Sequence, residues 1–188
     1  MIIERTMGRE AKNFKLRQSE TITIVLLIIA ILIISCNENK EVSSMNPENW
    51  SKRSAVINTE DSLEFGKSYL SIYSQIYSLS EHKTHNLTAM VSLRNTSDSD
   101  TIYILKAEYY DTHGKSIRKY FDNPIFLAPM ETTEIIIDEI DTSGGTGSNF
   151  IFEWNIPQNS PEPLFEGIMS STMSQQGLSF TTHAVRVK

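Results

Sequence analysis

Residues 101–110 read TIYILKAEYY, a stretch rich in the β-branched and aromatic residues that favour strands. Turn-forming residues bound this stretch on both sides, TSDSD at 96–100 and DTHG at 111–114. Residues 87–94, just upstream, alternate apolar and polar side chains with the period of two that is typical of a half-buried strand. We therefore predict two neighbouring strands and expect them to pair as a hairpin.

The period of two extends over most of the chain beyond residue 62. Further strands are expected at 68–77, 117–121, 150–154, 164–173 and 178–187, with short apolar runs at 125–127 and 134–137. No segment after Ile34 carries an apolar stripe at helical spacing. Seven or eight short strands separated by Gly, Pro, Asn and Asp predict an all-β fold, an antiparallel β-sandwich. An immunoglobulin-like sandwich would make Trp154 its core tryptophan, although the paired cysteines of that fold are absent.

A row of tyrosines stands out in the strand expected at 68–77. Alternation places Leu70 and Ile72 on one face of this strand, and Tyr69, Tyr73 and Tyr77 on the other. Aromatic side chains carry a large apolar area, so we expect this row to form the second wall of a core. A platform for a sugar is the alternative.

The composition limits the classes of function. The chain has 188 residues and a net charge of -6, which argues against a nucleic-acid binder because such affinity rests on Lys and Arg. A single cysteine cannot form an internal disulfide or a zinc site with two or more thiolates. The length fits one ordinary domain.

The N-terminus has the anatomy of a signal peptide. Residues 1–20 are rich in Lys and Arg, and residues 21–34 read TITIVLLIIAILII without a charge. Fourteen helical residues rise roughly 21 Å, which is short of the roughly 30 Å hydrocarbon core of a bilayer. The last two residues of this run and the next two read Ile33-Ile34-Ser35-Cys36, which resembles the lipobox that a signal peptidase recognises in bacterial lipoproteins.

The lipobox resemblance implies a lipid anchor on Cys36. A thiol can carry a diacylglycerol thioether, and a small Ser35 lets the peptidase reach the bond before the cysteine. In such proteins the new amino group usually carries a further fatty acid such as palmitate, and two or three chains give stable anchoring. The alternative is a buried apolar helix or an uncleaved N-terminal anchor with an incidental cysteine.

Cleavage before Cys36 divides the chain into a signal peptide at 1–35, a lipidated cysteine with a flexible tether at 36–61, and a sandwich domain at 62–188. Twelve basic and twenty acidic residues remain after cleavage, a balance of -8. An acidic surface does not adhere to anionic headgroups, so the lipid must anchor the protein. In the tether, Trp50 either docks on the domain or stays exposed.

We expect the protein at a bacterial membrane, facing the periplasm or the exterior. Asn37, rather than Asp, follows the cysteine, which by enterobacterial sorting rules slightly favours the outer membrane. Inner and outer membrane, periplasmic and surface exposure, and a start at Met1 or Met7 all stay open.

Six blocks of sequence from residue 66 onward have a distinctive pattern: GKSYLSIYSQIY (66–77), LTAMVSLRNT (87–96), IYILKAEYYDTHGK (102–115), LAP (127–129), DTSGGTGSNFIFEW (141–154) and SQQGLSF (174–180). Together they resemble a bacterial family known as domain of unknown function 3124. The resemblance implies a secreted or lipid-anchored domain and carries no known activity.

The loop at 141–149 is the candidate binding loop. Its aspartate can cap backbone amides, three glycines admit positive φ, and exposed N–H groups can form an anion-binding nest. A tight connection between strands is the alternative. The candidate residues are Asp141, Thr142, Ser143, Gly144, Gly145, Gly147 and Asn149, with Gln175 and Gln176 as neighbours.

Other motifs have simpler interpretations. Asp141-Thr142-Ser143-Gly144 echoes an aspartic-protease signature, but such an enzyme needs two copies. The sequence at 114–116, GKS, lacks the first glycine of a phosphate-binding loop and predicts a hairpin turn. His82 and His85 lack further metal ligands, and the oxygen ligands near Asp98 lack the glycine and glutamate of a calcium loop.

We therefore expect a non-enzymatic binding or assembly module of the cell envelope, without a cofactor, a catalytic residue or a metal. Its partners would be membrane lipid through acylated Cys36 and an envelope protein or glycan, with no nucleic acid. An envelope hydrolase or its accessory subunit is one alternative, and a structural spacer is the other.

Overall fold

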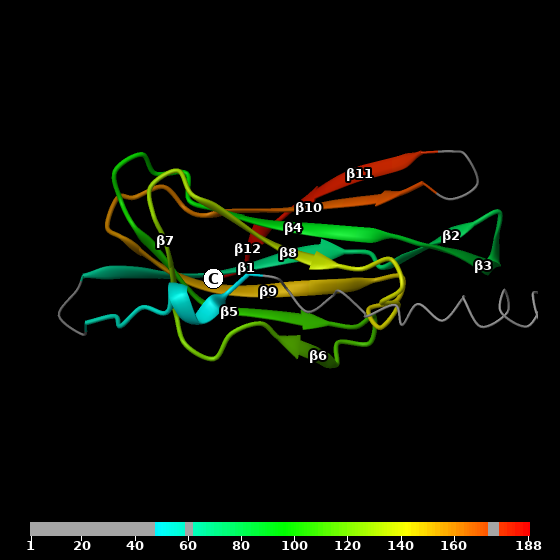
Figure 1. The fold of residues 1–188 in the computed structure, drawn as a ribbon, viewed down its shortest axis with the longest axis horizontal. Helices are drawn as coiled ribbons and strands as arrows, with labels where there is room; N and C mark the ends of the chain where they lie inside the picture. The colour runs from blue at the N-terminus through cyan, green and yellow to red at the C-terminus, as the bar shows by residue number, and fades with distance from the viewer. Residues whose placement is uncertain (1–47, 59–61, 173–176) are drawn as a thin grey trace, which may run out of the picture. The chain divides into compact units, whose positions relative to one another are not determined.

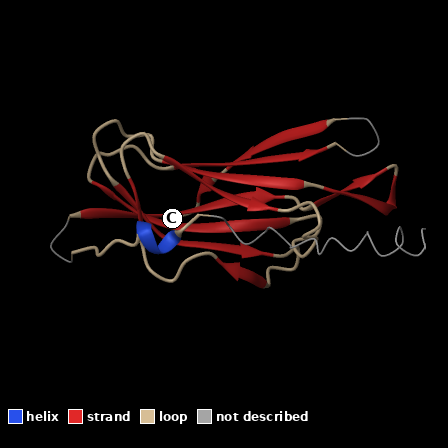
Figure 2. Ribbon diagram, in the orientation of Figure 1, coloured by secondary structure: helices blue, strands red, loops and turns tan. Residues whose placement is uncertain are grey.

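A computed structural model describes residues 48–58, 62–172 and 177–188. In these ranges the chain forms strands and one 3-10 helix, η1 (Figures 1 and 2). The elements are η1 (Trp50–Arg53), β1 (Leu63–Ile72), β2 (Gln75–Ser78), β3 (Ser80–Asn86), β4 (Thr88–Arg94), β5 (Ile102–Tyr110), β6 (Ser116–Lys119), β7 (Ile125–Leu127), β8 (Thr132–Ile137), β9 (Ser148–Pro157), β10 (Leu164–Ser171), β11 (Leu178–His183) and β12 (Val185–Arg186).

The strands form two antiparallel sheets that pack as a sandwich (Figure 1). The six-stranded sheet has the order β12-β1-β9-β5-β6, and β7 also pairs with β5. The four-stranded sheet has the order β11-β10-β4-β8. This architecture confirms the predicted all-β sandwich. The strands expected at 87–94, 101–110, 125–127 and 150–154 are present with similar or longer bounds, because alternation in the sequence records which face each strand buries. β1 begins at Leu63 rather than at residue 68, and β3 was not expected.

The core lies between the sheets and is made by alternate residues of each strand. Trp154 is its largest fully buried side chain, and the indole Nε1 donates to Ser68 Oγ at 3.0 Å. Phe152 of the six-stranded sheet stacks on Phe165 of the other, with ring centroids 4.1 Å apart. The two sheets therefore share one core.

The predicted hairpin of the strands at 87–94 and 101–110 is wrong. β4 pairs with β10 and β8, whereas β5 pairs with β9, β6 and β7 in the other sheet. The connection crosses between sheets and is held by Asn95, whose side-chain amide donates to the carbonyls of Leu127 and Ala128 at 3.1 and 2.9 Å. Alternation reveals the buried face of a strand but not the neighbour with which it pairs.

The single strand expected at 68–77 is interrupted. β1 ends at Ile72, and β2 and β3 form a separate two-stranded sheet at one end of the sandwich (Figure 1). The predicted row of core tyrosines is only partly right. Tyr73 packs against the core, with its ring centroid 5.9 Å from that of Phe180, whereas Tyr69 is half-buried on β1 and Tyr77 is 60% exposed. Buried Ser74 lies at the break, where its hydroxyl donates to the Gly145 carbonyl at 3.1 Å.

Part of the segment assigned to the tether packs on the sandwich. The Trp50 ring lies 5.3 Å from the ring of Phe121, which decides between the two alternatives for Trp50 in favour of docking. Arg53 pairs with Glu131 at 2.6 Å and with Glu48 at 2.9 Å. The segment 48–58 therefore contacts the domain through Trp50 and Arg53. The polar composition of this segment predicted a tether because it does not show which side chains have partners on the domain.

The predicted signal peptide, the lipobox residues Ile33, Ile34, Ser35 and Cys36, and the pair Gln175 and Gln176 lie outside the described residues. Within the described ranges, no helix is long and apolar enough to cross a membrane.

Candidate functional site

The loop that joins β8 to β9 contains the candidate residues from Asp141 to Gly147, whereas the candidate Asn149 lies within β9. Two carbonyl groups of this loop accept hydrogen bonds from neighbouring segments. The Gly144 carbonyl accepts from the Thr112 N–H at 3.1 Å and from Thr112 Oγ1 at 3.0 Å. The Gly145 carbonyl accepts from the Gln75 N–H at 3.1 Å and from the Ser74 hydroxyl. These bonds tie the loop to the β5–β6 turn and to the β1–β2 break.

Several amides of the loop are also engaged inside the protein. The Ser143 N–H donates to Asp141 Oδ1 at 3.1 Å, and the Gly145 N–H donates to the Thr142 carbonyl at 3.1 Å. The Gly147 N–H donates to Thr112 Oγ1 at 3.0 Å. An anion-binding nest needs free consecutive amides, so these contacts favour the interpretation as a tight connection between strands.

The three loop glycines have different roles. Gly145 alone has a positive φ, of 72°. Gly144 instead permits a close approach, since a Cβ atom there would lie 1.8 Å from Tyr109 Oη and 2.7 Å from Ser148 Oγ. The Tyr109 hydroxyl donates to Ser148 Oγ at 3.2 Å, and this buried pair needs the space that Gly144 leaves.

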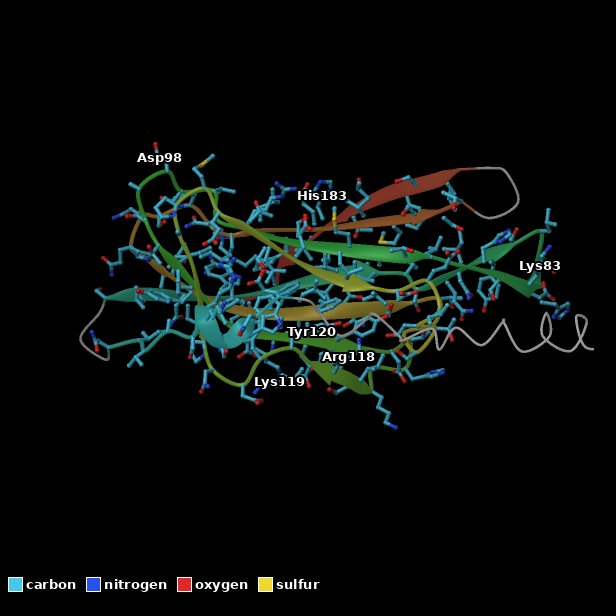
Figure 3. The ribbon with its side chains drawn as sticks, in the orientation of Figure 1. Lys83, Asp98, Arg118, Lys119, Tyr120 and His183 are labelled. Carbon is cyan, nitrogen blue, oxygen red and sulfur yellow. The ribbon has the colours of Figure 1, made fainter. Side chains whose placement is uncertain are left out.

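Asp141 is a buried carboxylate with an ion-pair partner. It lies 3.1 Å from Arg118 Nη2, and the Ser143 hydroxyl donates to its Oδ1 at 2.5 Å. Arg118 also donates to Tyr120 Oη at 3.2 Å, and both side chains are labelled in Figure 3. Burial raises the pKa of Tyr120 to about 12, although the hydrogen bond from Arg118 opposes the shift. This arrangement holds β6 to the loop, as a structural ion pair does.

The remaining motifs lie at separate places in the fold. The turn at 111–114 joins β5 to β6 as predicted, with Gly114 at φ 77°. His82 is exposed and lies within β3, rather than before a strand as expected. In the described part of the chain, no three His, Cys, Asp or Glu side chains are grouped to hold a metal ion.

A surface that the sequence did not single out lies on the outer side of the six-stranded sheet. The residues of this surface are identified from the register of the paired strands, because these strands are neighbours in the sheet but distant in sequence. Phe65 of β1 pairs with Asn155 of β9, which pairs with Tyr103 of β5, which pairs with Phe126 of β7. The inward neighbours of these four residues are mostly buried, so the four side chains form one outward line, the aromatic row.

A line of charged side chains runs beside the aromatic row. Lys67 pairs in register with Glu153, which pairs with Lys106, and we call these three residues the charged row. Lys67 Nζ lies 3.3 Å from Glu153 Oε1, and Lys106 forms an ion pair with Glu108. Each lysine of the row therefore has an acidic partner on the same face.

Glu108 holds together the end of this face. Its carboxylate accepts from the hydroxyls of Tyr110 and Ser116, both at 2.5 Å, as well as pairing with Lys106. Desolvation opposes ionisation of Glu108, but these hydrogen bonds outweigh it and lower the pKa from 4.5 to about 2. This end of the face is thus a connected set of ion-paired and hydrogen-bonded side chains.

Acidification should test the Glu108 network. Because the folded pKa of Glu108 is about 2 and the ordinary value is 4.5, the network stabilises the fold above pH 4.5. That stability should be lost progressively as the pH falls from 4.5 towards 2. The measurement is the urea midpoint against pH for the wild type and for Glu108→Gln, and the variant should show a shallower decline across this window. Parallel curves would contradict the assignment.

The sequence contains part of the signal for this face. The strand expected at 150–154 leaves 151 and 153 on its outward face, as observed, and β9 extends this alternation to Asn149 and Asn155, so Asn149 lies on the strand rather than in the loop. Asn149 pairs in register with Tyr110 and Ser71, on the same face. Alternation does not show the strand order β1-β9-β5, so the sequence alone could not predict that the residues of the aromatic and charged rows lie side by side.

These features define an all-β protein, an antiparallel sandwich with a networked polar and aromatic face on its larger sheet. The chain belongs to the family described as "Protein of unknown function (DUF3124)", whose model matches residues 66–187. No curated protein and no solved structure matches the chain.

Proposed function

We propose that the protein is a lipid-anchored binding module of a bacterial cell envelope, and that the outer face of its six-stranded sheet is the binding surface. The observation that carries the proposal is the face itself: an aromatic row beside a charged row whose lysines are paired with carboxylates. Side chains that are already held in place lose little entropy when a partner binds.

The lipobox at 33–36 supports the anchor. An aliphatic pair, a small residue and then the only cysteine of the chain follow directly on an apolar run that is short for a membrane span. Acyl chains contribute about 0.8 kcal/mol for each buried CH₂ group, so two or three chains would hold an acidic protein at a bilayer. Electrostatic adhesion would not, given the balance of -8 beyond residue 35.

The docking of residues 48–58 bears on how far the module would stand from the membrane. Trp50 and Arg53 contact the sandwich, so only residues 37–47 separate the proposed anchor from the docked segment. Eleven residues span at most about 40 Å when fully extended. An anchor at Cys36 would therefore keep the binding face within reach of partners close to the bilayer surface.

Cys36→Ala should abolish lipidation. Without the thiol no thioether can form, so metabolic labelling with a fatty acid should give no labelled band, and mass spectrometry should find the uncleaved precursor. Ser35→Ala is the matched control, because alanine keeps the small side chain that the peptidase needs, and this variant should still be labelled. Label that survives Cys36→Ala would overturn the anchor.

The binding surface has its own test. A photo-crosslinking amino acid placed at Tyr103, on the aromatic row, should capture the partner in cells, whereas the same group at Tyr77 should not. Tyr77 is a useful reference because it is 60% exposed but lies on β2, away from the face. A hydrolase or a spacer predicts no stable adduct specific to Tyr103.

A further inference from the structure

We propose that the aromatic row binds a neutral glycan chain that lies across the strands β1, β9, β5 and β7. The inference rests on the proposed function, since it names the ligand class of the proposed binding surface. It is carried by the order of side chains along the row, Phe65, Asn155, Tyr103 and Phe126, which places a hydrogen-bonding amide between aromatic rings.

Ring spacing is the first argument. Phe65 and Tyr103 lie on strands separated by β9, so their positions are two inter-strand spacings apart, about 10 Å. That separation is close to the length of two sugar rings in an extended chain. The apolar C–H face of a sugar packs on an aromatic ring, so a chain crossing the sheet would meet Phe65 and Tyr103 two sugars apart and Phe126 at the sugar after Tyr103.

The available polar groups are the second argument. Sugars present hydroxyls around the ring edge, which need both donors and acceptors. Asn155 offers both within the row, and the adjacent charged row offers the ammonium groups of Lys67 and Lys106 and the carboxylate of Glu153. Carboxamide, ammonium and carboxylate groups together match the mixed donor and acceptor pattern of a hydroxyl-rich ligand.

Charge is the third argument, and it favours a neutral glycan. Lys67 pairs with Glu153 and Lys106 pairs with Glu108, so these four side chains carry no net charge. Lys119, in register with Glu108, pairs with Asp122, and Lys188 lies over the Phe65 ring at one end of the row. A strongly charged polymer would have to break these pairs, and breaking a charged hydrogen bond is costly. A neutral chain can bond to the paired groups without separating them.

Exposure identifies the most informative residue for a test. Phe65 is 39% exposed, but Lys188 Nζ lies 5.7 Å from its ring centroid, so a substitution of Phe65 would also remove this cation–π contact. Tyr103 is half-buried, occupies the middle of the face and has the inward-facing Ile102 and Ile104 as chain neighbours. Its substitution alters the outer surface and leaves those core contacts in place.

Retention on insoluble glycans tests the inference. Full-length protein in detergent is passed over β-1,4-linked glucan and over β-1,4-linked poly-N-acetylglucosamine, two neutral chains with different side groups. We expect the wild type to be retained on at least one of them, and Tyr103→Ala and Asn155→Ala to be retained at least about tenfold more weakly. Tyr103→Phe keeps the ring and should bind like the wild type.

Tyr77→Ala is the matched control, because it removes an exposed tyrosine that lies outside the row, and it should bind normally. Thermal melts of every variant show whether a loss of retention reflects unfolding. The inference is overturned if neither glycan retains the wild type, or if Tyr103→Ala binds as well as the wild type while folded.

The crosslinking and labelling experiments separate this inference from the proposed function. A crosslink from Tyr103 to a protein, or to a second copy of this chain, with no glycan retention would overturn the glycan and leave the module standing. Glycan retention by a chain that shows no acyl label would overturn the anchor and leave the ligand standing.

Discussion

Trp154→Ala should lower the free energy of unfolding by about 3–5 kcal/mol. Trp154 is the largest fully buried side chain, and its ring fills the space above Gly66, where a Cβ atom would lie 2.1 Å from the indole. Truncation would leave a cavity in the centre of the six-stranded sheet. It would also leave the Ser68 hydroxyl without the indole N–H, which donates to it at 3.0 Å.

Urea unfolding followed by circular dichroism measures this loss. Trp50→Ala is the matched control, because Trp50 is a half-buried tryptophan that packs at the edge of the core, and it should cost less. A loss at Trp154 no larger than the loss at Trp50 would show that the core does not depend on the central indole.

Gly144→Ala should lower the free energy of unfolding by about 3 kcal/mol, at the upper end of the usual cost of overpacking. A Cβ atom at this position would lie 1.8 Å from Tyr109 Oη and 2.7 Å from Ser148 Oγ. Both hydroxyls are buried and bonded to each other, and Ser148 also donates to the Ile72 carbonyl at 2.7 Å. The loop would have to move away from the strands that hold it.

Tyr109→Phe provides the test of this mechanism. It removes the oxygen that the new methyl group would meet first, so the double variant should recover part of the stability lost in Gly144→Ala. Gly177→Ala is the control, since a Cβ atom there has no neighbour within 4 Å and should change stability little. Strict additivity of Gly144→Ala and Tyr109→Phe in denaturant titrations would contradict the proposed steric conflict.

The expected results for Trp154→Ala and Gly144→Ala bear on function because they distinguish residues that stabilise the fold from residues that bind a partner. The loop at 141–149 drew attention in the sequence for its glycines and its aspartate, yet Gly144, Gly145 and Asp141 all make contacts that hold strands together. Substitutions in this loop are therefore expected to act through stability. Substitutions of Tyr103 and Asn155 should instead change binding in a protein that remains folded.

Much of the strand pattern was predictable from the chain. The alternation in residues 87–94 and 148–157 reports which side chains are buried, because successive side chains of a strand point to opposite faces. Trp154 was correctly placed in the core, and the turn at 111–114 was correctly placed between two strands. These are local properties, and local sequence carries them.

Pairing was not predictable in the same way. The strand at 101–110 follows the strand at 87–94 after a short polar connection, which is the usual signal of a hairpin. The side-chain amide of Asn95 instead binds this connection to the carbonyls of Leu127 and Ala128, at the end of β7. The next strand, β5, therefore enters the other sheet. The deciding contacts join residues more than thirty positions apart. The break at Ser74 has the same origin, since its partner is the distant Gly145.

The sequence by itself determined the all-β class and the approximate positions of most strands, because both depend on composition or on a short period along the chain. Only the tertiary structure decided which strands are neighbours, and with that the meeting of Phe65, Asn155 and Tyr103 on one face. The physical reason is that hydrogen bonds between strands pair backbone groups without regard to side-chain identity, so many registers satisfy the same alternation. The packing of one shared core selects among them.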